Sequence, residues 1–503
     1  MTSSIPDQSQ SFWIDSTLES SYPSLTEDLS VDVAIVGAGL VGIMAAQLLK
    51  KAGKTVAVIE AEKVGTGVSG HTTAKVTSLH RLKYAELMKN MGEEKARIYA
   101  ESNQAAVEKI AEIVQTENID CDFERKSTYT FAPTTQELDK VKEEAEAAIK
   151  LGLPASFVPE TDLPFQVAGA VKFENQAQFH PRKYLLALAA KINGDGSYIF
   201  ENSRVKTVDG EEPCRVLTEN GATVTATDVI IATNIPILDQ GLFFAKSYPK
   251  RSYLIGAWID PAKDPQGMYI GADENYRSIR TTPHEGKTLL LIGGEGHKVG
   301  EADDTVERFE RLAEYARSKF GVNEIAYRWS SQDMYSFDDL PYIGKLTPIS
   351  NHTYVATGFS LWGMTKTTLS AMILSDMILG QENPWAKLYE ATRPTPFVTQ
   401  ESIKQNLDVG MHWVGDRFKG ITEAVEDIGL DRGKVVMVKG KQIAAYKDKT
   451  GQLHQVSAVC SHLGCIVAWN QAEKSWDCPC HGARFNCEGE VLNGPAVKDL
   501  KKM

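Results

Sequence analysis

The order of apolar and polar positions predicts alternating strands and helices over most of the chain. Between residues 30 and 60, a strand-like apolar run, a glycine-rich turn, an apolar helix and a second strand-like run follow one another. Amphipathic helical patterns then cover 84–116, 136–151 and 304–320, with strand-like segments between them. This alternation indicates an α/β domain, and the less regular middle of the chain indicates an α+β part beside it.

The pattern changes after residue 390. Residues 391–432 contain Pro394 and Pro396, polar runs and no sustained apolar period, which is typical of a connection between domains. From residue 433 onward, short strand-like segments separated by turns indicate an all-β unit. We therefore expect a main domain over 1–390, a linker over 391–432 and an all-β domain over 433–503.

Composition and charge narrow the class of protein and its partners. The chain is 42% hydrophobic and 24% charged, which is typical of a soluble globular protein. Its formal net charge of −12 argues against nucleic acid or an anionic membrane surface as partner, because both reward clustered Lys and Arg. The start of the chain lacks the basic and apolar regions of a secretory signal. The apolar stretch 31–49 fits a strand and helix joined by a glycine turn better than a membrane span, and the stretch 369–379 fits a short core helix better. We expect a cytoplasmic protein with no integral membrane segment.

A glycine-rich motif lies between the first strand and the first helix. Gly37, Gly39 and Gly42 form G-x-G-x-x-G, and Glu60 closes the next strand. The first two glycines allow a tight turn and a close approach of the backbone to a pyrophosphate, and the third lets the helix pack on the strand. The helix N-terminus stabilises phosphate charge, and Glu60 can accept hydrogen bonds from a ribose hydroxyl. A glycine-rich turn without a ligand is the alternative, but strand, helix and acidic residue together favour a dinucleotide site.

Five of the seven cysteines fall within a short stretch near residue 470, which indicates metal or redox chemistry rather than a disulfide scaffold. Cys460 and His462 lie in the segment CSHLGC, and Cys478 and His481 lie in the segment CPCHGARF. A tetrahedral Cys₂His₂ zinc site is one interpretation, but zinc-finger histidines usually stand together on a helix. Two thiolates for one iron and two imidazoles for the other are the ligands of a Rieske 2Fe–2S centre. We interpret the cysteines outside these segments as ordinary thiols: Cys121, Cys214 and Cys487.

The main domain resembles the FAD-dependent oxidoreductases of the D-amino-acid-oxidase superfamily. The matching segments are the glycine motif, GVSGHTTAKVT at 67–77, DVIIATN at 228–234, and DDLPYIGKL and YVATGFSLWGMTKT at 338–346 and 354–367. The resemblance implies FAD, and we expect it to be bound non-covalently. It also implies an α/β FAD-binding part of Rossmann type (about 30–84, 171–234 and 326–390) and an α+β substrate domain (about 85–170 and 235–325).

The same resemblance implies which residues contact FAD and substrate. The residues expected to bind FAD are Gly37, Ala38, Gly39, Gly42, Glu60, Thr72, Thr73, Val205, Thr233, Gly358, Gly363, Met364 and Thr365. The candidates for catalysis at the flavin face are His71, Lys75, Tyr253, His297 and Trp362. Some relatives carry a histidine bonded covalently to the flavin in the turn that holds His71, although the flanking residues differ here. Trp362 can also be interpreted as an aromatic residue of the core. His297 can also be interpreted as a loop histidine held by hydrogen bonds.

The all-β part resembles Rieske domains of the cytochrome bc type. The resemblance implies that Cys460, His462, Cys478 and His481 hold a 2Fe–2S cluster, and that Cys465 and Cys480 form a disulfide between the two ligand loops. GPAVKDL at 494–500 resembles the proline loop that covers the cluster. High-potential members carry a serine and a tyrosine where this chain has Ala483 and Phe485. Losing these hydroxyl donors predicts a low to intermediate reduction potential.

Both parts together resemble a family of bacterial flavoproteins that carry a Rieske domain after the flavin domain. We expect an FAD-dependent oxidoreductase for a small amine or amino acid that passes electrons through the cluster to an external acceptor. The alternatives are an oxygen-reducing oxidase with a structural or regulatory Rieske domain, reverse electron flow from a reductase, and a non-catalytic redox sensor. The candidates for binding a substrate carboxylate are Arg251, Arg277 and Arg280.

Overall fold

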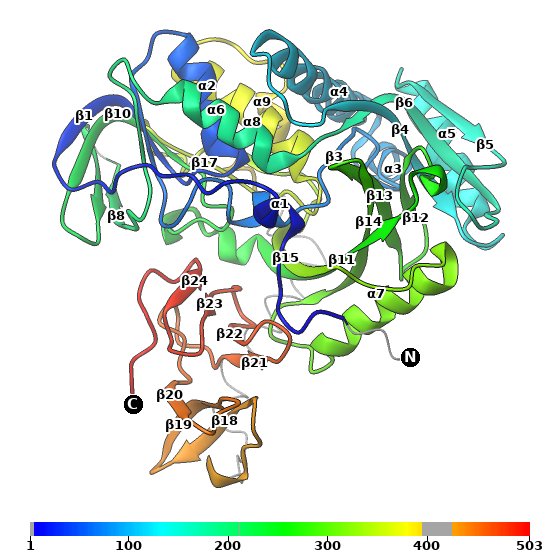
Figure 1. Ribbon diagram of the computed structural model, residues 1–503. Coiled ribbons are helices and arrows are strands. Elements are labelled where there is room, and N and C mark those ends of the chain that lie inside the picture. The colour runs from blue at the N-terminus through cyan, green and yellow to red at the C-terminus, as the bar shows by residue number, and fades with distance from the viewer. Residues whose placement is uncertain (1–4, 211, 395–424) are drawn as a thin grey trace.

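A computed structural model describes residues 5–210, 212–394 and 425–503 of the protein (Figure 1). Most of the predicted linker falls on 395–424, outside the described residues. The described chain forms two large sheets with helices on their faces and a smaller β-domain beneath them (Figure 1). The predicted combination of α/β, α+β and all-β parts is confirmed.

The first sheet has eight strands and carries the glycine motif. Its path is β16-β17-β10-β1-β2-β7, with β9 beside β10 and β8 beside β9. The strands are β1 (Leu29–Val36), β2 (Val56–Ile59), β7 (Tyr198–Phe200), β8 (Val205–Asp209), β9 (Cys214–Thr218), β10 (Thr223–Ile231), β16 (Tyr342–Lys345) and β17 (Thr353–Thr357). The central pairs β2–β7, β1–β2, β1–β10 and β10–β17 are parallel. Parallel strands are buried on both faces, so they have continuous apolar sequences such as VAVI in β2.

The helices cover the sheets and include a break that the sequence pattern did not predict. They are α1 (Phe12–Asp15), α2 (Leu40–Lys51), α3 (Tyr84–Met91), α4 (Glu93–Thr116), α5 (Leu138–Lys150), α6 (Pro181–Ile192), α7 (Thr305–Phe320), α8 (Gly363–Ile378) and α9 (Ala386–Tyr389). The single helix predicted over 84–116 is wrong, because Gly92 adopts φ +86° and ends α3 before α4 begins. The helix α2 packs against both α8 and α6, which explains why most of its residues are buried.

The second sheet has nine strands and lies beside the first (Figure 1). Its path is β15-β11-β14-β13-β12-β4-β6-β3, with β5 beside β6. The strands are β3 (Lys75–Val76), β4 (Glu124–Ala132), β5 (Ala155–Val158), β6 (Gly169–Gln178), β11 (Ser247–Ile259), β12 (Met268–Gly271), β13 (Arg277–His284), β14 (Lys287–Lys298) and β15 (Tyr327–Ser336). The sheet thus takes in β3, β6 and β15, which the sequence division counted mainly with the FAD-binding part. The residue boundaries of the two parts stay a prediction.

The β-domain consists of two small antiparallel sheets. One contains β18 (Arg432–Val438), β19 (Lys441–Lys447) and β20 (Leu453–Ser457), and the other contains β21 (Ala468–Asn470), β22 (Ser475–Asp477), β23 (Arg484–Phe485) and β24 (Val491–Asn493). The second of these sheets faces the main body of the molecule, and the first lies farther away (Figure 1). Among the described residues, no helix is both long and apolar enough to cross a membrane.

Candidate active site and cluster site

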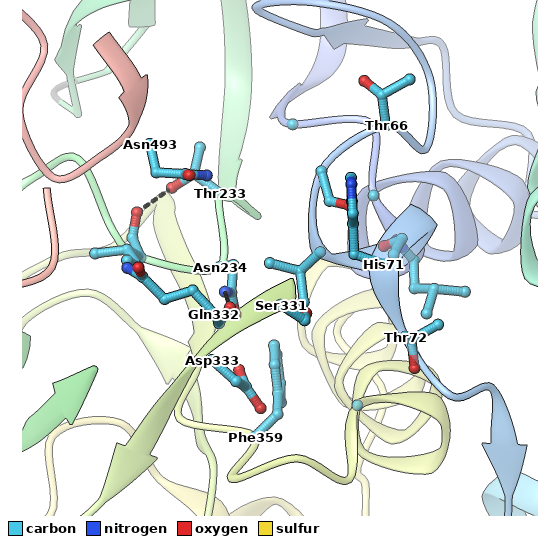
Figure 2. A pocket seen from close by; sticks show the side chains of 18 of the residues that line it. Thr66, His71, Thr72, Thr233, Asn234, Ser331, Gln332, Asp333, Phe359 and Asn493 are labelled. Atoms are coloured by element: carbon cyan, nitrogen blue, oxygen red, sulfur yellow. Dashed lines mark hydrogen bonds between the residues drawn. The ribbon is translucent and has the colours of Figure 1, made fainter. Parts of the chain in front are cut away.

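A cavity of about 520 Å³ lies where the two large sheets and the β-domain meet. Its walls come from the glycine motif, the turn after β2, the strands β11 and β15, the start of α8 and residues 492–497 of the β-domain. Figure 2 shows Thr66, His71 and Thr72 on one side, opposite Thr233, Asn234 and Asn493. The cavity therefore joins segments that are far apart in the sequence.

The glycine motif forms a stretch of bare backbone at one end of the cavity. Gly37 has φ +108°, and a Cβ there would meet the carbonyl oxygen of Ala232 at 2.7 Å. A Cβ on Gly42 would lie 1.9 Å from the carbonyl oxygen of Gly37. The Glu60 carboxylate accepts a hydrogen bond of 2.7 Å from the backbone N–H of Ala38, and burial raises the pKa of Glu60. Backbone without side chains beside a helix N-terminus fits the pyrophosphate of a dinucleotide.

Four buried side chains hold the backbone of the turn at residues 70–74 beside the cavity. Ser11, Trp13, Arg280 and Trp329 donate hydrogen bonds of 2.5–3.1 Å to carbonyl oxygens of this turn. These donors come from the N-terminal segment, β13 and β15, and the sequence analysis missed the roles of Ser11, Trp13 and Trp329. The turn is therefore positioned by distant segments, and the Arg280 guanidinium is engaged in this wall.

Most of the residues predicted to bind FAD line this cavity. Those on its surface are Gly37, Gly39, Glu60, Thr72, Thr73, Val205, Thr233, Gly363 and Met364. Those outside the lining are Ala38, Gly42, Gly358 and Thr365. Thr365 instead donates a hydrogen bond of 3.3 Å to the carbonyl oxygen of Thr77. The backbone N–H groups at the start of α8 lie where a helix stabilises negative charge.

Lys75 carries a buried ammonium or amine group on the cavity wall. Its Nζ donates hydrogen bonds to the carbonyl oxygen of Tyr269 (2.5 Å) and to the hydroxyl of Ser278 (2.6 Å). Burial, aided by the positive charge of Arg280, holds the pKa of Lys75 well below its usual value. Its environment therefore favours the neutral amine, which can take up a proton.

Tyr253 and His297 form a hydrogen-bonded pair beside the cavity. Tyr253 lines the cavity, whereas His297 lies behind it with Nε2 2.9 Å from the Tyr253 hydroxyl. The His297 Nδ1 lies 2.8 Å from the carbonyl oxygen of Lys298, which can only accept, so Nδ1 carries the hydrogen and Nε2 accepts from Tyr253. Burial lowers the pKa of His297 to about 4 and keeps the ring neutral. The Tyr253 oxygen is thus left with lone pairs for another donor.

His71 and Trp362 also line the cavity. The His71 Nδ1 lies 2.8 Å from the carbonyl oxygen of Gly67, and burial lowers the pKa of His71. Trp362 stacks on the ring of His80, with 4.7 Å between the ring centroids. Both of these candidates therefore have firm positions in the wall, and their catalytic roles stay predictions.

Asp333 is a cavity residue that the sequence analysis missed (Figure 2). Its carboxylate accepts hydrogen bonds from the backbone N–H groups of Leu361 (2.6 Å) and Met334 (2.9 Å). Burial raises the pKa of Asp333 to about 6. These bonds fix the turn that leads into α8, so Asp333 helps to place the helix N-terminus.

Of the three arginine candidates, Arg251 lines the cavity, and the lining does not include Arg277 or Arg280. Arg277 is paired with Glu295, and Arg280 holds the wall described above. Arg251 is fully buried and bonds to Ser330 and to Gln332. Two carboxylates of the β-domain lie near its guanidinium: Asp477 at 3.8 Å and Glu473 at 3.9 Å.

The four predicted cluster ligands are brought together in the β-domain. Each ligand loop is a tight turn: Cys460 N–H donates to the carbonyl oxygen of Cys465, and Cys478 N–H donates to that of Ala483, both at 2.8 Å. The rings of His462 and His481 have centroids 5.0 Å apart. The Nδ1 atoms of both histidines are buried and have no hydrogen-bond partner among the described residues. Two thiols outside any disulfide, together with two buried imidazole nitrogens that have no hydrogen-bond partner among these residues, fit a 2Fe–2S cluster.

A disulfide joins Cys465 and Cys480, with 6.5 Å between their Cα atoms. It connects the two ligand loops, while Cys460 and Cys478 remain free thiols. Ala483 and Phe485 are fully buried beside the loops and offer no hydroxyl to the cluster. The low to intermediate potential predicted from these two residues stays a prediction.

The cluster loops lie against the flavin-side domain. The Gln332 side chain donates a hydrogen bond of 2.7 Å to the carbonyl oxygen of Gly482, next to His481. The Asp239 carboxylate lies 2.8 Å from His462 Nε2, and the Phe244 ring lies 5.2 Å from the His481 ring. None of these interdomain contacts leaves a periodic signal in the sequence, so sequence reasoning missed them.

Comparisons with known proteins agree with both sites. Residues 32–377 match the family model for FAD dependent oxidoreductases, and residues 421–503 match that for the Rieske [2Fe-2S] domain. The protein YhfW of Bacillus subtilis, named as a Rieske 2Fe-2S iron-sulfur protein, is 37% identical over 98% of this chain and 97% of its own. Gamma-glutamylputrescine oxidoreductase of Escherichia coli is 26% identical over 71% of this chain and 86% of its own. The solved glycine oxidase of Geobacillus kaustophilus covers 72% of this chain and 99% of its own, with a TM-score of 0.61 and 20% identity.

A dinucleotide cavity beside an iron–sulfur site defines an oxidoreductase with two redox centres. The chain belongs to the family of FAD dependent oxidoreductases and carries a Rieske [2Fe-2S] domain after its FAD domain. It is therefore an enzyme whose cofactors are FAD and one 2Fe–2S cluster.

Proposed function

We propose that the protein is a dehydrogenase of small amines or amino acids, with electrons leaving the substrate through FAD and the Rieske cluster to a one-electron redox protein. When bound, FAD accepts two electrons from a carbon that carries nitrogen, and the cluster carries one electron at a time. Conversion of the amine to an imine releases two electrons and two protons. Two molecules of the external acceptor are therefore reduced in each turnover.

The observation that carries this proposal is the position of Gln332. Its side chain lines the FAD cavity, and its Nε2 donates to the carbonyl oxygen of Gly482 beside the cluster ligand His481. One residue thus reaches from the cavity wall to a cluster loop. The β-domain also supplies residues 492–497 to the cavity wall, so the two redox sites share a boundary. Such proximity supports transfer of electrons within one chain.

Three residues of the cavity suit an amine substrate. The lone pairs of the Tyr253 oxygen can accept a hydrogen bond from the substrate nitrogen, because the Tyr253 hydrogen is donated to His297. We assign Lys75 to take up the proton released from that nitrogen, since burial favours its neutral form. Arg251 lies on the cavity wall with a buried guanidinium and is the residue we assign to a substrate carboxylate, where one is present.

The names of two relatives support the proposed substrate class. The name of the Escherichia coli relative refers to gamma-glutamylputrescine and that of the solved structure to glycine, and both molecules carry an amino group. The acceptor is likewise defined by class alone, as a redox protein that takes one electron at a time.

An anaerobic screen of amines and amino acids tests the proposal. With a substrate, the flavin absorbance should bleach first, and the electron paramagnetic resonance signal of the reduced cluster should follow. A matched Cys478→Ser variant, which cannot hold the cluster, should show the bleaching without the later signal. Bleaching in the intact protein with no cluster signal would contradict the proposal.

The alternatives give different results in the same screen. Peroxide formed in air at the turnover rate indicates an oxidase. Cluster reduction that precedes flavin reduction when an external reductase is added indicates reverse flow. If the protein is a redox sensor, no amine or amino acid in the screen would bleach its flavin absorbance.

A further inference from the structure

A segment of the flavin-side domain covers the imidazole edge of the cluster site. Residues 235–246 follow β10 and contain the short helices η2 (Asp239–Gly241) and η3 (Phe243–Ala245). Asp239 Oδ1 lies 2.8 Å from His462 Nε2. A carboxylate oxygen accepts, so His462 Nε2 carries the hydrogen, and the unpartnered Nδ1 is the atom left for iron.

The second histidine is covered by the same segment. The ring of Phe244 stands edge-on to that of His481, with centroids 5.2 Å apart. His481 also shares a small apolar pocket with Leu238 and Phe243 of the segment and with Pro495 of the β-domain. The His462 side chain is only 6% exposed, whereas that of Asp239 is 53% exposed. Both imidazoles are therefore buried under a neighbouring domain that contributes one carboxylate.

We propose that Asp239 is a positioning residue for the cluster that acts across the domain interface, and that it makes this interface depend on the redox state of the cluster. The oxidised cluster carries one more positive charge than the reduced cluster. A carboxylate hydrogen-bonded to a ligand imidazole therefore interacts more favourably with the oxidised state. The contact lowers the reduction potential and holds the oxidised domain more tightly than the reduced one.

The lowered reduction potential and the tighter docking of the oxidised domain express one coupling free energy. If docking of the β-domain stabilises the oxidised state of the cluster, the oxidised state must stabilise docking by the same free energy, because coupling between two equilibria is reciprocal. A tenfold difference between the docking equilibria of the oxidised and reduced domains corresponds to a shift of about 59 mV for a one-electron couple. The potential therefore measures the redox dependence of docking.

The role of redox-dependent docking in turnover rests on the proposed function, in which electrons pass from FAD to the cluster. With electrons supplied from the FAD side, Asp239 would hold the β-domain most tightly while the cluster was oxidised. The contact of Asp239 with His462 would be weaker when the cluster held the additional electron. The imidazole edge then becomes available to the external one-electron acceptor, which takes that electron and restores the docked state.

The test is a redox titration of the full-length holoprotein, followed by the electron paramagnetic resonance signal of the cluster. Asp239→Asn keeps an acceptor for His462 but removes the charge, and Asp239→Ala removes both. We expect the midpoint potential to rise in the order wild type, Asp239→Asn, Asp239→Ala, by about 59 mV for a tenfold change in docking preference. The matched control is Asp303→Asn, which removes the same charge from an exposed position of the flavin-side domain and should leave the potential unchanged.

A second readout separates docking from the potential alone. Hydrogen exchange of residues 235–246 should be slower in the oxidised protein than in the dithionite-reduced protein, and Asp239→Asn should abolish the difference. Unchanged potentials in both Asp239 variants, or equal exchange in the two redox states of the wild type, would overturn the inference. Iron content and the visible spectrum show whether each variant holds its cluster, and Asp239→Asn remains informative if Asp239→Ala does not.

The outcomes also separate this inference from the proposed function. If the potentials do not move but substrate still reduces the cluster through FAD, the inference fails and the function stands. If the potentials move but no amine reduces the flavin, the interface is redox-dependent and the proposed substrate class is wrong.

Discussion

The two redox sites of this protein are built in opposite ways. The ligands and the disulfide of the cluster site lie between residues 460 and 481, in two loops of one small domain. The FAD cavity draws its walls from the glycine motif near residue 37, from several later strands and from residues 492–497 of the other domain. A site made from neighbouring residues leaves a motif in the sequence, whereas a site assembled from distant segments leaves only fragments of one.

The dependence of the two sites on each other is also unequal. Residues 492–497 of the β-domain close part of the FAD cavity, but the four expected cluster ligands all belong to the β-domain itself. The glycine motif and the cluster ligands are well separated in the chain. We therefore expect each cofactor to be lost independently when its own local geometry is broken.

The largest effect is expected at the cluster. Cys478→Ser removes a thiolate ligand, so the protein should lose its iron and its cluster signal completely while it keeps FAD. Iron analysis and the flavin absorbance measure the two contents in one sample. Cys487→Ser is the control, since this partly buried cysteine lies outside the ligand loops. Loss of FAD together with the cluster would show that the cavity needs an intact cluster domain.

The converse change is Gly42→Ala. A Cβ at this position would lie 1.9 Å from the carbonyl oxygen of Gly37, so the turn that approaches the pyrophosphate cannot keep its shape. We expect the purified protein to lose nearly all of its FAD and to keep the cluster signal. A variant that retains FAD at the wild-type ratio contradicts the role given to this turn.

A smaller effect is expected from the bond between the ligand loops. The disulfide joins cysteines separated by 15 positions, and a loop of this length contributes about 3 kcal/mol in the chain-entropy model. The double change Cys465→Ser and Cys480→Ser should lower the thermal stability of the cluster signal but leave that of the flavin signal. Equal losses in both signals would mean that the two domains unfold as one unit.

The smallest expected effect concerns pH and the flavin side. The unfolded chain binds a proton on histidine near pH 6.5, but the folded protein binds one on His297 only near pH 4, so the unfolded state holds more protons between these values. Stability therefore falls as the pH drops through this window, by a contribution on the order of 2 kcal/mol once partial exposure is allowed for. His297→Gln should reduce this loss, measured by urea unfolding at pH 7 and pH 4.5. His284→Gln is the control, and an unchanged pH dependence in His297→Gln would contradict the assignment.

Local patterns in the sequence predicted the parts of the fold whose burial they determine. The strand β2 and the C-terminal ends of β1 and β10 are apolar because both of their faces are covered, and G-x-G-x-x-G marks the turn between β1 and α2. The break at Gly92 was missed because the apolar period continues across it, although φ there is +86°. The order of strands in the second sheet was also beyond prediction, since a strand's own residues do not identify the distant strand with which it pairs.

The same distinction applies to the sites. The four expected cluster ligands could be picked out of the sequence because they come in two pairs with fixed spacing, and their role as ligands stays a prediction. Asp333, Gln332 and Asp239 could not, because each is one polar residue in an unremarkable segment and gains its role from a contact made after folding. Family resemblance selected the cavity residues of the flavin side, but it gave no information about the surface on which the second domain rests.

The contribution of residues 492–497 to the cavity wall has a consequence for how the protein is made. These residues leave the ribosome long after the glycine motif and the rest of the cavity wall. While the chain is being synthesised, the pocket is therefore open on that side, and FAD can enter before the wall is complete. Folding of the iron–sulfur domain then adds this last part of the wall, so the order of translation favours loading of the organic cofactor ahead of the inorganic one.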